Sequence, residues 1–287
     1  MVAIGRDGVR RFGFEAPNGP GLELEVVRRA ELCARGGEPA LREPHRTEFH
    51  QIVFYHDGGT SHEIDFVEYG CSPGTVVWVR PGQVQRFGPP VAGEFVLFTP
   101  VVPAPSPEVA ALLGDRSATS VWHTEPGAYA DLREVVRQLR IEAAYPGGAA
   151  DEARRHLLSV LLLRIGRLGP ARSAAVDQDG VAARFAEAVE RDFASVHRVA
   201  DYADRLGYSV RTLTRASAAA TGHSARELVD ARIALEAKRL LAYTDLSASA
   251  VGRRLGFSEP TNFGKFFLRR TGLTPAAFRR DLAGRAS

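Results

Sequence analysis

The chain has 287 residues, 45% of them apolar and 25% charged, which excludes a disordered or fibrous protein and leaves room for two domains. Its 37 basic residues outnumber its 34 acidic ones by only three, so the total charge excludes no class of partner. Two cysteines, no signal peptide and no run of eighteen apolar residues exclude a disulfide framework, a self-contained zinc site and a membrane span, and they favour a cytoplasmic location.

Short strands separated by Gly- and Pro-rich turns are expected between residues 22 and 99. Apolar and polar residues alternate, or β-branched and aromatic residues cluster, in five segments at 22–26, 49–55, 62–67, 75–79 and 95–98. Closely spaced strands with no helical pattern between them predict an antiparallel β-barrel or sandwich.

One of these strands mixes aromatic and polar side chains on a single face. Phe49, Gln51, Val53 and Tyr55 alternate along it, and side chains two residues apart point to the same side of a strand. We predict a pocket for a small effector that is lined by Phe49, Gln51, Tyr55 and Trp78. A filled barrel core that holds no ligand is the alternative.

Two helices are predicted at 129–145 and 152–168, because apolar residues recur three and four positions apart and Pro146 with two glycines interrupts the pattern between them. The second helix carries more apolar side chains than one core-facing stripe requires, which indicates a homodimer interface. Burial of these side chains within the same chain is the alternative. They are Leu157, Leu158, Val160, Leu161, Leu162 and Ile165.

Small and polar residues replace the apolar pattern at 169–180, as in an interdomain linker. The chain therefore divides into an N-terminal domain at 1–168 and a C-terminal domain at 181–287. The C-terminal domain has 18 basic and 11 acidic residues and a net charge of +7, whereas the rest of the chain carries −4. This asymmetry favours a nucleic acid or another anionic partner for the C-terminal domain.

The basic domain contains an internal repeat. Leu206-Gly-Tyr-Ser209 and Leu255-Gly-Phe-Ser258 lie 49 residues apart, and each follows a short amphipathic helix and precedes a second helix that ends in Thr-Gly. A helix, a glycine-containing turn and a second helix together form a helix-turn-helix motif. We expect Gly207 and Gly256 to take a positive φ, and Ser209 and Ser258 to cap the second helices.

The residues around this repeat also fit two motifs on one chain. A small residue in each first helix, Ala203 or Gly252, would let the second helix cross closely. Between the motifs, residues 224–243 are predicted to form one helix of about 30 Å at ~1.5 Å per residue. Because one turn of DNA is ~34 Å, one chain could place both second helices in successive turns of the major groove.

The C-terminal domain resembles the AraC/XylS family of transcription regulators. The resemblance depends on residues 206–215, 221–222, 232–241 and 255–258, on the aromatic residues of the second motif and on the closing segment 271–279, and it covers 181–282 without a gap. It implies sequence-specific binding to double-stranded DNA through both second helices. The predicted DNA-binding residues are Ser209, Arg211, Thr212, Thr214 and Arg215 in the first motif, and Ser258, Thr261, Asn262, Lys265 and Arg269 in the second.

These positions differ in how well their side chains can form hydrogen bonds with DNA. Arg211 and Arg215 share a helix face and can donate to guanine edges or phosphate, and Asn262 can pair with adenine. For Arg215, a phosphate contact without base information is an equal alternative. Pro260 has no donor where family members often carry a polar side chain.

Two further expectations concern the cores of the motifs. Ala216-Ser217 stands where the family packs a bulky residue and Phe, which predicts a looser core in the first motif. Aromatic residues at helical spacing are usually core residues, so four phenylalanines of the C-terminal domain are expected to be buried rather than stacked on bases. They are Phe263, Phe266, Phe267 and Phe278.

The N-terminal domain resembles the cupin-like sensor barrel that family members carry before a pair of dimerisation helices. The resemblance depends on residues 45–50, 58–59, 65–66 and 80–86. A metal-dependent cupin enzyme is the alternative, and it needs two or three His and a carboxylate on one ion. Only His45 stands at an expected ligand position, since Thr47, Gln51 and Gln85 occupy the others. We therefore predict no metal, no cofactor and no catalytic residue.

Together these patterns predict an α+β protein, in which a cupin-like antiparallel β-barrel with a helical hairpin is linked to an all-α domain with two helix-turn-helix motifs. The predicted function is a DNA-binding transcription regulator, not an enzyme, that responds to a small-molecule effector through the barrel. RNA polymerase and a second copy of the chain are its further expected partners. The alternative is a metal enzyme or a structural adaptor tethered to DNA.

Overall fold

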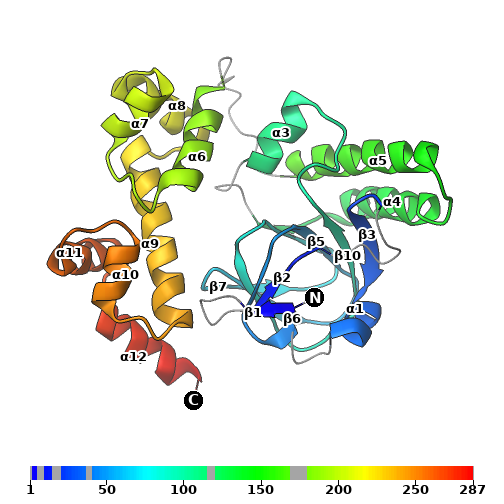
Figure 1. Cartoon of the computed structure of the whole chain (residues 1–287). Coiled ribbons are helices and arrows are strands. Elements are labelled where there is room, and N and C mark those ends of the chain that lie inside the picture. Colours follow the sequence, from blue (N-terminus) through cyan, green and yellow to red (C-terminus); the bar gives the residue numbers. More distant parts are fainter. Residues whose placement is uncertain are drawn as a thin grey trace. The chain divides into compact units, whose positions relative to one another are not determined.

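The computed structural model describes residues 2–4, 10–14, 21–36, 41–114, 120–168 and 180–286. The chain divides into two compact units, 1–171 and 172–287. A β-rich unit followed by an all-helical unit confirms the predicted α+β fold class (Figure 1). The linker predicted at 169–180 lies outside the described residues, except for Gly180.

The first unit contains two β-sheets. Their strand orders are β1-β2-β4-β9-β6-β7 and β11-β8-β5-β10-β3. Among the described residues all neighbouring strands pair antiparallel except β2 and β4, and because β2 precedes the segment 22–99, the antiparallel pairing predicted for that segment is confirmed. The strands are β1 (Val2–Ile4), β2 (Arg10–Phe12), β3 (Leu24–Arg28), β4 (His45–Thr47), β5 (His50–Tyr55), β6 (Thr60–Ile64), β7 (Val67–Cys71), β8 (Thr75–Val79), β9 (Val84–Phe87), β10 (Gly93–Phe98) and β11 (Val121–His123).

The central strands of the five-stranded sheet are buried on both faces. Every residue of β5, β8 and β10 is buried. Val53 and Tyr55 pack in an apolar cluster with residues of the six-stranded sheet, whereas Ile52 and Phe54 pack on the other face with residues of two long helices. Burial on both faces explains why these strands are nearly continuous apolar runs in the sequence.

The segment predicted as one strand at 62–67 is instead a hairpin. β6 ends at Ile64 and β7 begins at Val67, and the turn residues Asp65 and Phe66 have φ of 50° and 71°. The prediction is wrong because the apolar and polar alternation continues through a turn that contains neither Gly nor Pro. The Asp65 carboxylate stabilises the turn by accepting hydrogen bonds from the backbone N–H of Val84 and the side chain of Gln83, both at 3.1 Å.

Helices α4 (Pro126–Glu142) and α5 (Gly148–Gly166) form the predicted helical hairpin and lie side by side (Figure 1). The sequence did not predict α1 (Arg29–Gly36) or α3 (Pro107–Gly114). Of the six apolar residues expected at a dimer interface, only Val160 is exposed, at 40%. The others contribute to the core of this unit, with four of them fully buried. Most of the apolar surplus therefore stabilises the chain's own fold, as the alternative interpretation expected.

The second unit consists of helices in its described part. They are α6 (Val181–Asp192), α7 (Val199–Leu206), α8 (Val210–Thr221), α9 (Ala225–Tyr243), α10 (Ala248–Arg254), α11 (Pro260–Thr271) and α12 (Pro275–Ala286). The long helix α9 connects the pair α7–α8 to the pair α10–α11 (Figure 1). It begins with a capping box, in which Ser224 Oγ accepts from the Glu227 N–H and the Glu227 carboxylate accepts from the Ser224 N–H.

The two predicted helix-turn-helix motifs are present as α7–α8 and α10–α11. Gly207 and Gly256 have φ of 72° and 79°, which confirms the left-handed turn after each first helix. Ser209 caps α8, because its side chain accepts a hydrogen bond from the Thr212 N–H at 3.0 Å. Each second helix ends at a glycine with positive φ, Gly222 or Gly272.

The prediction that Ser258 caps α11 is wrong. Glu259 is the N-cap residue, without a side-chain capping hydrogen bond, and Pro260 is at the first helical position. Proline suits that position because its ring fixes φ and its missing N–H would have no helical partner. Five residues, 255–259, separate the helices of the second motif, whereas three residues, 207–209, separate those of the first.

Close packing within the second motif requires the small residue predicted there. A Cβ on Gly252 of α10 would lie 2.9 Å from the Cβ of Phe263 of α11. The four phenylalanines expected in the core are all buried, which confirms that prediction. In the first motif Ser217 takes the position of Phe267, and its Oγ is buried without a hydrogen-bond partner among the described residues.

Candidate nucleic-acid interface

The second helix of the first motif presents two cations to solvent. Arg211 and Arg215 of α8 lie one helical turn apart and are exposed. Neither makes an ion pair within the described part of the chain. Thr214 lies between them and is half-buried. This face therefore offers guanidinium groups that the protein fold itself does not use.

Two of the predicted DNA-binding residues in the first motif already have a structural role. Ser209 Oγ lies 2.8 Å from Thr212 Oγ1 and also caps the helix at the Thr212 N–H. Ser209 is exposed and Thr212 is half-buried. The pair fixes the start of α8, and its remaining oxygen lone pairs and hydroxyl hydrogens are available to a phosphate or a water molecule.

The second helix of the second motif carries a similar exposed face. Thr261, Asn262, Lys265 and Arg269 of α11 are all exposed and recur at helical spacing, with Lys265 one turn after Thr261 and Arg269 one turn after Lys265. Ser258 is exposed in the turn that precedes the helix. The two cations make no ion pair among the residues the structure describes.

Other arginines of this unit are occupied by contacts within the fold. Arg232 of α9 donates to Glu190 at 2.5 Å and to Glu236 at 3.2 Å, and its guanidinium lies 3.7 Å from the centroid of the Phe193 ring. Arg279 of α12 donates to three backbone carbonyl groups at and after the end of α9. The net charge of +7 thus combines structural arginines with the exposed cations of α8 and α11.

The interior of the β-rich unit contains a hydrogen-bonded polar chain. Gln51 and Gln85 face each other across the interior, with Gln51 Nε2 donating to Gln85 Oε1 at 3.2 Å. The same oxygen accepts from His62 Nε2 at 2.9 Å, and Tyr55 OH donates to His62 Nδ1 at 3.1 Å. Burial lowers the pKa of His62 to about 3, so its imidazole is neutral near pH 7.

The predicted effector pocket is only partly assembled. Phe49, Gln51 and Tyr55 are buried toward the interior between the two sheets. Trp78 pairs with Ile52 across β5 and β8 and packs with it in the cluster under the helical hairpin. The prediction is therefore wrong for Trp78, since it lies on the opposite face of the sheet. His62 and Gln85 take its place beside Gln51 and Tyr55. No short segment indicates this grouping, because Gln85 follows Gln51 by 34 positions and His62 belongs to a different strand.

The histidines of this interior do not assemble a metal site. His45 Nδ1 lies 2.9 Å from the Glu43 carbonyl oxygen, and burial lowers the pKa of His45 to about 4. In the described ranges, no three His, Cys, Asp or Glu side chains come together in an arrangement that could hold a metal ion. Across the same residues, no helix is both long enough and apolar enough to cross a membrane.

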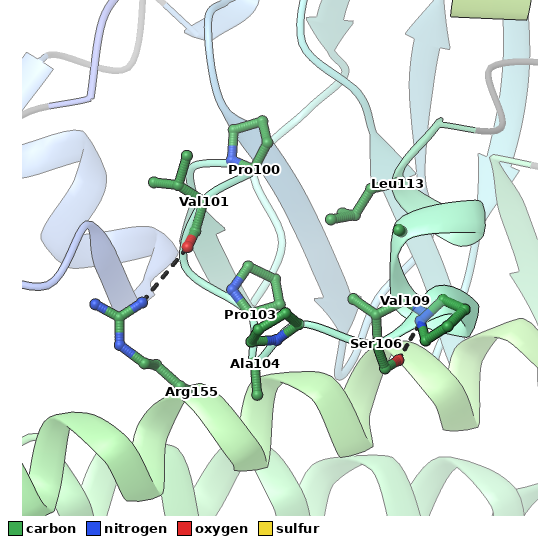
Figure 2. A pocket seen from close by; sticks show the side chains of 11 residues that line it. Pro100, Val101, Pro103, Ala104, Ser106, Val109, Leu113 and Arg155 are labelled. Atoms are coloured by element: carbon green, nitrogen blue, oxygen red, sulfur yellow. Dashed lines mark hydrogen bonds between the residues drawn. The ribbon is translucent and has the colours of Figure 1, made fainter. Parts of the chain in front are cut away.

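A groove of about 750 Å³ lies outside the sheets, where the proline-rich segment after β10 meets α3 and α5 (Figure 2). Arg155 of α5 donates to the carbonyl groups of Val101 and Val102 at 3.4 and 3.0 Å, and Ser106 Oγ accepts from the Val109 N–H. The polar side chains in the groove thus hold the loop and α3 in place. None of the predicted site residues lines this groove.

Comparison with known proteins matches both parts of the chain. A family model described as an AraC-like ligand binding domain matches residues 30–165, and one described as a helix-turn-helix domain matches residues 202–281. The HTH-type transcriptional activators RhaS of Citrobacter koseri and of Salmonella arizonae are each 24% identical, over 90% of this chain and 98% of the relative.

Two solved structures are also similar. The DNA-binding domain of AdpA, in complex with a target DNA, is 30% identical, with a TM-score of 0.33, and the match covers 36% of this chain and 95% of that one. ToxT from Vibrio cholerae is 15% identical, with a TM-score of 0.40, over 91% of this chain and 98% of that one.

Proposed function

This chain belongs to the AraC family of transcription regulators, and on that premise we propose that it binds specific duplex DNA sequences through α8 and α11. The observation that carries this proposal is the repeated motif with exposed cations at equivalent places. Arg215 is the sixth residue of α8 and Lys265 is the sixth residue of α11, so these two cations occupy matching positions on the second helices. In a helix-turn-helix protein this helix enters the major groove.

Each predicted side chain is proposed to act through its own chemistry. Arg211 and Lys265 would donate to guanine O6 and N7, and Asn262 would donate to and accept from adenine. Thr214 and Thr261 would contact base edges, and Arg215 a guanine or a phosphate group. Arg269 and the hydroxyl groups of Ser209, Thr212 and Ser258 would contact phosphate groups. The phosphate contacts fix the position of the chain on the duplex, and the base contacts select the sequence.

A small polar effector is proposed to bind inside the β-rich unit, next to Phe49, Gln51 and Tyr55. The support is the chain of amide, imidazole and phenol groups that joins Gln51, Gln85, His62 and Tyr55 between the two sheets. A ligand with hydroxyl groups would exchange hydrogen bonds with these groups. Binding would regulate transcription by its different affinity for two arrangements of the protein.

Association into a homodimer through the helical hairpin is the second element of the proposal. After the burial of most apolar residues of α5, Val160 and Leu163 remain exposed on it, at 40% and 38%. RNA polymerase is the further proposed partner, because a regulator bound at a promoter must change its recruitment or its activity. We also propose a cytoplasmic location, where a bacterial regulator meets its DNA.

The test is selection of duplexes by the full chain from a randomised pool at ~150 mM salt. We expect enrichment of two short sequence elements about one helical turn apart, and a footprint that covers both. Enrichment of no sequence would reject the proposal. The effector is tested by measuring the affinity of the protein for the selected duplex in the presence of each of a set of neutral polyols. A polyol that changes this affinity must bind the free and the DNA-bound protein with different affinities.

A further inference from the structure

The linker helix α9 carries a buried carboxylate that contacts the second recognition helix, α11. Asp230 is only 3% exposed. Its Oδ2 accepts a hydrogen bond from Arg226 Nε at 3.0 Å, one turn earlier on α9, and another from the guanidinium of Arg270. Arg270 is in the last turn of α11. A single carboxylate oxygen therefore joins the C-terminal end of α11 to the early part of α9.

Stability alone gives little reason for such a carboxylate. Removing a carboxylate from water is costly, and apolar residues of similar volume often stabilise a fold as well as a buried ion pair does. An ion pair differs from an apolar contact in its geometry, because the carboxylate oxygen accepts only at particular distances and directions. Asp230 thus fixes where α11 lies along α9 more narrowly than a phenylalanine or leucine contact would.

The turn before the opposite end of α11 is held against the loop that precedes the first motif. A Cβ on Gly256, in the turn before α11, would lie 2.5 Å from the carbonyl oxygen of Ala194, in the loop between α6 and α7. In the same loop, the ring of His197 lies 4.8 Å from the ring of Phe257. Phe257 and Phe266 also pack in the apolar core of the first motif. The second recognition helix is therefore positioned from both of its ends.

Helix α6, which packs against both helices of the first motif, is fixed to α9 by a separate set of contacts. Arg232 of α9 donates to Glu190 of α6, and its guanidinium covers the ring of Phe193 at the end of α6. Asp230 and Arg232 are two residues apart on α9 and so point to different sides of the helix. One short stretch of α9 thereby contacts α11 directly and the first motif through α6.

We infer that Asp230 is a positioning residue for DNA recognition, which sets the register of α11 against α9 so that the two motifs read their subsites at one fixed spacing. The inference builds on the proposed function, since it assumes that both second helices enter the groove. Asp230 itself does not touch DNA. Its loss would let α11 shift relative to α8, and the second subsite would be engaged less often.

The experiment uses the full chain and the duplex that the wild-type protein selects from a random pool. Affinity is measured on that duplex, on one with the α11 subsite randomised, and on one with a single base pair inserted between the subsites. Wild-type protein should bind the inserted duplex much more weakly than the selected one. For Asp230→Asn we expect about tenfold weaker binding to the selected duplex, unchanged binding when the α11 subsite is randomised, and a smaller penalty for the insertion.

Two further variants make the result specific. Arg270→Gln removes the other partner of the ion pair from a side chain that is 29% exposed, so it leaves the buried carboxylate bonded to Arg226 and should show the same pattern. Glu94→Gln is the matched control, because it removes a buried carboxylate that pairs with Arg140 in the first unit, which contains neither motif. It should leave the spacing penalty at the wild-type value.

Each outcome decides the question. An equal loss on the selected and the half-randomised duplex, or a spacing penalty that survives both Asp230→Asn and Arg270→Gln, would overturn the inference while the proposed function stands. A wild-type chain that selects no sequence would overturn the proposed function, and the inference with it.

Discussion

Gly252 of α10 and Phe263 of α11 are in contact at the crossing of the second motif, where a Cβ on the glycine would lie 2.9 Å from the Cβ of Phe263 and 3.0 Å from its Cγ. Phe263 is itself buried and packs with its ring 5.5 Å from the ring of Phe257 and 5.8 Å from that of Phe267. The phenylalanine cannot move without disturbing both neighbours. The distance between the two helices of this motif is therefore set by the absence of a side chain at one position.

Gly252→Ala is accordingly expected to destabilise the second unit by about 1 to 3 kcal/mol, the usual cost of overpacking a well-packed site. The measurement is denaturant unfolding of the full chain. Gly264→Ala on α11 is the control, since no atom lies within 4 Å of its Cβ position. It should stabilise the helix by roughly 0.5 to 1 kcal/mol. Equal effects of the two substitutions would contradict the close crossing.

Ser209, the capping serine of the first motif, is expected to contribute to the stability of the fold, whereas Ser258, its counterpart in the second motif, is not. Ser209→Ala removes the acceptor for the Thr212 N–H and should cost about 1 kcal/mol of stability. Ser258→Ala removes no capping hydrogen bond, because Glu259 is the N-cap residue of α11, and should change stability by less than about 0.5 kcal/mol. Thermal unfolding of both variants checks this, and a larger loss for Ser258→Ala would restore the cap predicted from the sequence.

Arg211→Ala should relax base preference at one operator position at a cost of about 1 to 3 kcal/mol, if this guanidinium reads a base. Selection from a random pool by the variant, followed by comparison of base frequencies, measures the effect. Arg137→Ala on α4 is the charge control, because Arg137 is exposed and pairs with Glu134 of the same helix. An equal loss of affinity on selected and random duplexes would assign Arg211 to a phosphate instead.

The buried histidines should make the first unit sensitive to acid. Their pKa values are lowered by burial from 6.5 to about 3 for His62 and about 4 for His45. The unfolded chain therefore binds more protons than the folded chain between about pH 4 and 6.5. Above pH 6.5 both rings are neutral in the folded and the unfolded chain, and they do not lower the free energy of unfolding. As the pH falls from 6.5 toward the lowered pKa values, the free energy of unfolding decreases.

By pH 5 each of the two histidines should reduce stability by about 2 kcal/mol, since one pKa unit corresponds to ~1.4 kcal/mol. Thermal unfolding between pH 7 and pH 5 measures the loss, and His62→Gln should make it smaller. His156→Gln is the control, because His156 is exposed on α5 and pairs with the equally exposed Glu152. A dependence on pH that His62→Gln leaves unchanged would show that the buried ring is not its source.

The features that could be predicted correctly from the sequence each depend on residues that are close together along the chain. The turn at Gly207, the cap at Ser209 and the buried spacing of Phe263 and Phe267 each follow from a few adjacent positions. Because the motif occurs twice, each copy supports the interpretation of the other. For this reason the amino-acid sequence alone indicates the helical unit and the two second helices that carry its exposed cations.

The errors concern relationships that no short segment contains. Trp78 lies under the hairpin because β8 pairs with β5 in a register that sets it opposite Ile52, and register cannot be read from one strand. Asp65 and Phe66 form a turn without Gly or Pro because the carboxylate accepts from residues nearly twenty positions later. Equally, composition does not distinguish the structural Arg232 and Arg270 from the exposed Arg211.

The most direct test of the whole account is the ratio of affinities for the selected duplex and for a random duplex, measured for wild-type protein and for Arg211→Ala/Lys265→Ala at ~150 mM salt. We predict a wild-type ratio of at least about 10³, as is typical of specific DNA-binding proteins. The double variant should bind the selected duplex at least about a hundredfold more weakly, and the random duplex only slightly more weakly. A wild-type chain that binds both duplexes equally, or a double variant that keeps the full ratio, would contradict recognition through α8 and α11.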